Sequence, residues 1–132
     1  MIDPESYVYE RVFEKITSTY KDIAITDEEI YTPPKLPSVS LIMFDNTIAT
    51  ETNDSSNKEK YSSATFEASV YTDGKNKKRR GKEIFDALDK EMKAIGFIRT
   101  SYNVLNQDYS SIQRIVARYT AICGENNTFY WR

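Results

Sequence analysis

The sequence contains no histidine among its 132 residues. This absence excludes Ser–His and Cys–His nucleophile pairs, the usual general base and imidazole metal ligands. The single cysteine, Cys123, excludes an internal disulfide and a zinc site built from several thiolates. Because Cys123 follows an apolar run, we expect it to be a buried structural thiol.

Glycine and long apolar segments are scarce as well. The four glycines are too scattered for a P-loop or a dinucleotide-binding pattern. No apolar stretch approaches the roughly 20 residues that span a bilayer, and residues 1–5 do not resemble a signal peptide. We therefore expect a soluble protein that is made in the cytoplasm, has no membrane partner and no cofactor, and is not an enzyme. The glycines are Gly74, Gly81, Gly96 and Gly124.

Carboxylates are plentiful, so a Mg²⁺ site or a glycosidase-type acid pair makes an enzyme a distant alternative. Around residues 86–91, lysines recur at helical spacing, which favours a solvated helix face with weak ion pairs. The two candidate groups are Asp27, Glu28 and Glu29, and Asp86, Asp89 and Glu91.

Residues 61–72 and 112–123 alternate between apolar and polar side chains, as half-buried antiparallel strands do. Shorter strands are expected at 22–26 and 39–48 and from residue 97. On the two long strands the expected core face comprises Ala64, Phe66, Ala68, Val70, Ile115, Ala117, Tyr119 and Ala121.

Apolar residues at helical spacing predict two amphipathic helices. The first covers about residues 4–20 and buries Val8, Val12 and Ile16, and the second starts near Ile84 and ends at Gly96. The resulting order of helix, strands, helix, strands predicts a single α+β domain over 1–132. In this fold a mostly antiparallel sheet carries both helices on one face.

Two polar segments contribute little to such a core. Residues 49–60 contain no large apolar side chain, and residues 125–132 combine a polar turn with an aromatic end. We expect both to be flexible or interface-forming. The aromatic end has the residue types enriched in interface cores, although folding back onto the chain's own sheet is an equal alternative. These residues are Phe129, Tyr130, Trp131 and Arg132.

Charge is distributed unevenly although the net charge is only −2. Residues 75–82 carry six cations and no acid, and without them 12 basic residues face 20 acidic ones, a net charge of −8. Cations at a helix N-terminus oppose the helix dipole, so the run is either a loop before the second helix or is held by an anionic partner. A solvated loop without a partner explains it equally well. The cations are Lys75, Lys77, Lys78, Arg79, Arg80 and Lys82.

Taken in order, several segments resemble the tail terminator proteins of tailed bacteriophages that infect low-GC Gram-positive bacteria, also called tail completion or head-to-tail joining proteins. The resemblance spans residues 5–132, although the charge at 77–82 is denser than the family pattern. The matching segments are 7–10 (YVYE), 23–25 (IAI), 33–40 (PPKLPSVS), 66–72 (FEASVYT), 92–100 (MKAIGFIRT), 115–121 (IVARYTA) and the aromatic C-terminal segment.

The resemblance implies a structural virion protein that forms a ring, expected to be a hexamer, at the head-proximal end of the tail tube. Such a ring ends tube polymerisation, contacts the tail tube protein and a neck or stopper protein, and passes DNA through its lumen without sequence-specific binding. Within the ring, the basic run is expected to face acidic residues of the next subunit, with Glu28, Glu29 and Glu51 as candidates.

Two other functions remain open at this stage. One is another neck protein, such as a stopper or head–tail connector, which also forms small rings. The other is a small nucleic-acid-binding module that uses residues 75–82, for which salt-dependent DNA binding without ring formation is expected.

Overall fold

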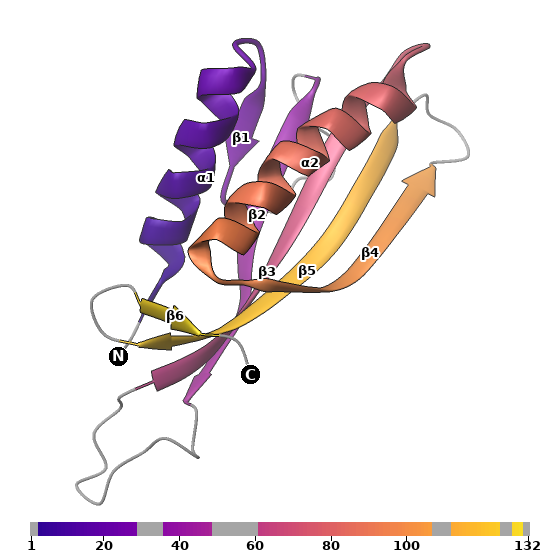
Figure 1. Ribbon diagram of the computed structural model, residues 1–132. Helices are drawn as coiled ribbons and strands as arrows, with labels where there is room; N and C mark the ends of the chain where they lie inside the picture. Colours follow the sequence, from indigo (N-terminus) through magenta and orange to yellow (C-terminus); the bar gives the residue numbers. More distant parts are fainter. Residues whose placement is uncertain (1–2, 29–35, 49–60, 107–111, 125–127, 131–132) are drawn as a thin grey trace, which may run out of the picture.

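Two helices lie side by side across one face of a six-stranded sheet (Figure 1). The computed structural model describes residues 3–28, 36–48, 61–106, 112–124 and 128–130. The elements are α1 (Glu5–Thr19), β1 (Ala24–Thr26), β2 (Ser38–Ile48), β3 (Tyr61–Thr72), α2 (Lys77–Ile95), β4 (Ile98–Asn106), β5 (Gln113–Gly124) and β6 (Thr128–Tyr130).

The strand order is β1-β2-β3-β5-β4, with β6 paired to the end of β5. Only β1 and β2 run parallel; the other neighbouring strands are antiparallel. The predicted α+β class, with a mostly antiparallel sheet and both helices on one face, is confirmed. The expected polar loop 49–60 lies outside the described residues.

The core forms between the helices and the covered face of the sheet. Val8, Val12 and Ile16 of α1 are fully buried, as their spacing predicts. The eight residues expected on the core face of β3 and β5 are also all buried. Their burial confirms the strand alternation, because period-two sequences place every second side chain on one face.

The boundaries of the helices follow local chemistry. The Asp3 carboxylate accepts a 3.1 Å hydrogen bond from the backbone N–H of Glu5, which satisfies one free donor of the first turn. At the other helix, Gly96 ends α2 with a φ of 127°, a backbone conformation that favours glycine. No helix in the described part of the chain is long and apolar enough to cross a membrane.

Candidate functional site

The helix α2 begins at Lys77, so the basic run forms its first turns, and Lys75 alone of the six cations precedes it. Two side chains of the sheet hold this turn: Thr72 Oγ1 donates to the Lys77 carbonyl at 2.9 Å, and Gln113 Nε2 donates to it at 3.3 Å. Gly81 allows the close approach, since a Cβ there would lie 2.9 Å from Gln113 Nε2. The expectation of a loop is wrong because these tertiary contacts outweigh the unfavourable charges.

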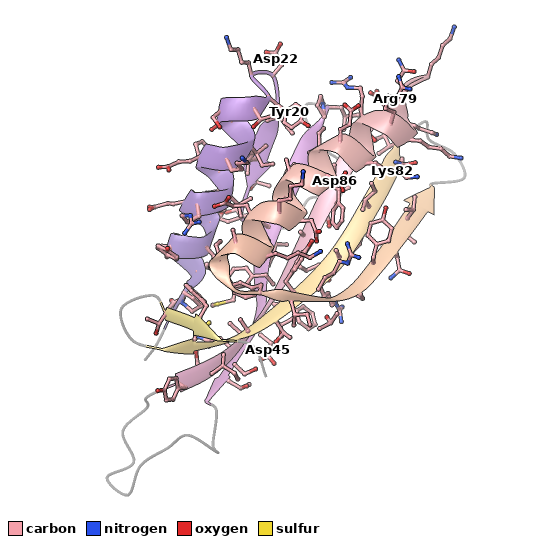
Figure 2. The ribbon with its side chains drawn as sticks, in the orientation of Figure 1. Tyr20, Asp22, Asp45, Arg79, Lys82 and Asp86 are labelled. Carbon is pink, nitrogen blue, oxygen red and sulfur yellow. The ribbon has the colours of Figure 1, made fainter. Side chains whose placement is uncertain are left out.

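The start of α2 is strongly electropositive. Its first turn contains no acidic residue, and Asn76 provides no side-chain cap. Lys78, Arg79, Arg80 and Lys82 are exposed, and none of them forms an ion pair with another residue that the structure describes. The cations therefore add to the positive end of the helix dipole. Figure 2 shows Arg79 and Lys82 on these turns, at the end of α2 far from Gly96.

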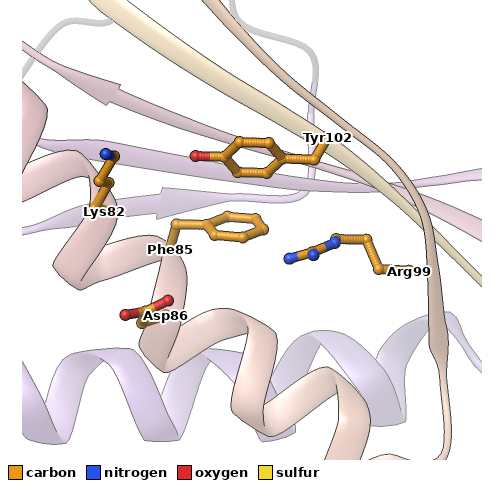
Figure 3. A pocket seen from close by; sticks show the side chains of 5 residues that line it. All are labelled: Lys82, Phe85, Asp86, Arg99 and Tyr102. Carbon is orange, nitrogen blue, oxygen red and sulfur yellow. The ribbon is translucent and has the colours of Figure 1, made fainter.

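Beside these turns lies a hollow of about 200 Å³ between α2 and β4 (Figure 3). It is lined by Lys82, Phe85, Asp86, Arg99 and Tyr102. The Arg99 guanidinium lies 5.8 Å from the Phe85 ring centre and 5.4 Å from that of Tyr102, within cation–π range. Because most small-molecule pockets measure roughly 300–1,000 Å³, this hollow fits a protein side chain better than a metabolite.

A β-bulge places both Arg99 and Tyr102 at the hollow. The register of β4 against β5 shifts between Arg99 and Ser101, so Arg99 lies opposite Tyr119 and Tyr102 lies opposite Ala117. Both partners belong to the core face of β5. Strict alternation would have put Arg99 and Tyr102 on opposite faces of the sheet.

Asp89 lies beneath the hollow and fixes Arg99. Its carboxylate accepts a 2.6 Å hydrogen bond from the Tyr119 hydroxyl and forms ion pairs with Lys93 at 2.8 Å and Arg99 at 3.4 Å. Burial opposes ionisation of Asp89, but the hydrogen bonds from Lys93 and Tyr119 and the charges of Lys93 and Arg99 outweigh it. The pKa of Asp89 is therefore lowered.

This geometry corrects one prediction. Asp89 was expected on a solvated helix face, yet it is only 8% exposed. Its position one residue after the buried Leu88 and four before Lys93 is compatible with either environment. The hydrogen-bond partner Tyr119, which makes the buried position of Asp89 favourable, is 30 residues away in the sequence. Burial raises the pKa of Tyr119, so its hydroxyl remains a donor to the carboxylate.

Strand β4 forms one edge of the sheet and exposes apolar side chains. In the described part of the chain it pairs with β5 alone. Tyr102, Val104 and Leu105 are 38%, 41% and 47% exposed, and they account for three of the five exposed large hydrophobic residues among those that the structure describes. Edge strands with exposed apolar groups are ready sites for pairing with another chain. The sequence pattern did not predict this surface; its one sign in the sequence is the adjacent apolar pair Val104–Leu105, which breaks the alternation.

The remaining predicted contact residues fall in different places. Glu28 is exposed beyond β1, where its carbonyl accepts a 3.0 Å hydrogen bond from Ser40 Oγ. Lys75 is exposed ahead of α2. Phe129 packs within its own chain, with ring centres 5.6 Å from Tyr7 and 5.5 Å from Phe97. Glu29, Glu51, the Tyr130 side chain, Trp131 and Arg132 lie outside what the structure describes.

The other carboxylates offer little for catalysis. Glu91 forms a 2.8 Å ion pair with Arg11 of α1. Among the described residues, no group of three or more acidic or cysteine side chains could hold a metal ion. Cys123 is buried as predicted, and burial raises its pKa to about 12.

The sequence matches no protein-family model and no curated protein. The site is therefore interpreted from its own residues, which form an exposed apolar and cationic edge.

Proposed function

We propose that this chain is a structural subunit of a ring at the head-proximal end of a phage tail tube. The ring ends tube polymerisation and joins the tail to the neck, and it has no catalytic role. The observation that supports this best is the edge formed by β4 and the start of α2. There, exposed Tyr102 and Val104 lie on the helix-covered face of β4, opposite core residues of β5. Tyr102 lines a hollow of side-chain size, and the adjacent turns of α2 carry cations without described ion-pair partners.

Each component of this edge suits a protein contact. Exposed apolar side chains on an edge strand gain free energy when a neighbour covers them. The exposed cations of the adjacent helix have no ion-pair partner among the described residues, and they steer an acidic surface toward the same place. The resemblance to tail terminators supplies the setting, a closed ring on a tube with DNA in its lumen.

The experiment begins with the mass of the purified protein by native mass spectrometry over a range of concentration and salt. It continues with electron microscopy of the protein added to tail tube protein during polymerisation. A tail terminator forms a closed ring, alone or on the tube, and shortens the tubes in proportion to its concentration. Tubes of unchanged length without terminal rings would rule the function out.

A second function, nucleic-acid binding, is supported by the cationic first turns of α2. It predicts that duplex DNA shifts the mass of the chain in a salt-dependent way while the chain itself stays monomeric. Neutralising Arg79 and Arg80 would then weaken DNA binding and leave the oligomeric state unchanged.

A further inference from the structure

Among the strands that the structure describes, β1 forms the second edge of the sheet, and the charges beside it are opposite in sign to those beside β4. We call the first surface the basic edge (Lys78, Lys82, Arg99, Tyr102 and Val104) and the second the acidic edge (Tyr9, Phe13, Asp27 and Glu28). From their chemistry we infer that the basic edge of one copy docks on the acidic edge of a second copy of this chain. The inference rests on the proposed ring and identifies its subunit interface.

The acidic edge is a continuous surface formed by α1 and β1. The Tyr9 hydroxyl donates a 3.3 Å hydrogen bond to the Ile25 carbonyl, so this flank of α1 lies over β1. Phe13, one turn later, has its ring centre 5.9 Å from that of Tyr9 and is 42% exposed. Asp27 lies close enough to help raise the pKa of Tyr9, after the larger effect of burial. Glu28 follows Asp27, and both are exposed.

The two edges carry opposite charges, and both expose apolar side chains. On the basic edge, Lys78 and Lys82 are one helical turn apart and therefore share the flank of α2 that borders the hollow. Asp86 is the one carboxylate that lines the hollow, and there Lys82 and Arg99 outnumber it. On the acidic edge, the turn between α1 and β1 contributes one charge of each sign, from Lys21 and Asp22.

Because the charges of Lys21 and Asp22 cancel, Asp27 and Glu28 give the acidic edge its negative charge. Each edge also exposes large apolar side chains beside its charges, so docking of the two edges would bury apolar surface.

The positions of the edges determine the kind of assembly. β1 and β4 are the first and last strands in the order β1-β2-β3-β5-β4, so the edges lie on opposite sides of the sheet. Figure 1 shows the same separation, with α1 and β1 on one side and β4 on the other. Contacts between unlike surfaces are heterologous, and they generate a closed ring when the rotation between neighbours closes. Each subunit in such a ring uses both edges.

The test reverses the charge of each edge separately. One variant combines Lys78→Glu with Lys82→Glu, and the other combines Asp27→Lys with Glu28→Lys. Alone, each variant places like charges across every interface, so we expect its dissociation constant to rise about tenfold or more at low salt. This difference should largely disappear at about 1 M salt, where the Debye length is about 3 Å.

Mixing the two variants restores opposite charges at both contacts of an alternating ring. We expect the equimolar mixture to assemble as the wild type does, with equal numbers of each variant by native mass spectrometry. The control variant is Lys15→Glu, which changes the net charge half as much as the basic-edge variant does. Lys15 lies one turn after Arg11, which pairs with Glu91 of α2, so the change falls on the flank of α1 that faces α2. The control should assemble normally, and thermal melts should show that all variants fold.

Rings that form equally well in both single-edge variants would overturn the inference while leaving the proposed function intact. If the wild-type chain closes its ring only on tail tubes, the two single-edge variants are compared there, and rings that form equally well in both would overturn the inference in the same way. The proposed function fails on a different result, namely that the wild-type chain neither caps nor shortens tail tubes.

Discussion

The Tyr119 hydroxyl and the Asp89 carboxylate are 2.6 Å apart, and this hydrogen bond joins the central strand β5 to α2. Both residues are buried, and the same carboxylate holds Arg99 at the hollow. The stability of the helix–sheet contact and the geometry of the basic edge therefore depend on one buried acid.

Removing the donor should measure what this bond contributes. Because hydrogen bonds to charged groups contribute about 1.5–3 kcal/mol, we expect Tyr119→Phe to lower the free energy of unfolding by about that amount. Urea denaturation followed by circular dichroism would measure it. Tyr102→Phe is the control, since Tyr102 is exposed and should change stability by less than about 0.5 kcal/mol. Equal losses of stability in Tyr119→Phe and Tyr102→Phe would contradict a stabilising role for the Tyr119–Asp89 hydrogen bond.

The lowered pKa of Asp89 predicts a specific acid sensitivity. An unfolded Asp takes up its proton near a pKa of about 3.9, whereas the folded protein keeps Asp89 ionised to lower pH. The stability that its ionised form contributes is therefore present above pH 4 and is lost as the pH falls toward the folded pKa.

The variant Asp89→Asn tests this dependence. It should be less stable than the wild type at pH 7, and it should lose less of its remaining stability between pH 5 and pH 3. Urea midpoints at several pH values would show the difference. A parallel decline of the two proteins would mean that other carboxylates cause the acid sensitivity.

The two glycines with positive φ offer a matched pair. Gly96 has a φ of 127°, and a Cβ there would lie 3.0 Å from Phe129 Cβ. Gly74 has a φ of 85° but nothing within 4 Å of an added Cβ. We expect Gly74→Ala to cost about 1–2 kcal/mol for the left-handed backbone alone. Gly96→Ala should cost clearly more, because Phe129 must also move. If urea denaturation gave similar losses in the free energy of unfolding for both variants, Phe129 and β6 would be shown to move at little cost.

Cys123 should be unreactive in the folded protein. Its side chain is buried, and its pKa of about 12 leaves very little thiolate at pH 8. We expect an aromatic disulfide reagent to modify it at least a hundredfold faster in urea than in buffer. Rapid modification without denaturant would indicate that this end of β5 opens locally.

The sequence predicted the elements well because their patterns are local. Alternation in 61–72 gave the bounds of β3, and apolar spacing identified the buried face of α1. The start of α2 was predicted too late, since Lys77 is held by Thr72 and Gln113 from two strands. A pattern of charges along the chain contains no information about such partners.

The candidate site was less predictable. The cations of α2 were identified from composition alone, but their environment was not. The hollow requires the bulge between Arg99 and Ser101. The fixed orientation of Arg99 requires Asp89 to be buried beside Tyr119.

The sequence by itself determined the class of fold, the buried faces of its strands and the concentration of positive charge, because each depends on residues near one another in the chain. Only the tertiary structure decided that β4 and β1 form opposite edges. It placed Lys82 beside Arg99 on one edge and Tyr9 beside Asp27 on the other. The physical reason is that strand order and register are set by packing between distant segments, and the faces and edges of a sheet exist only once that packing is complete.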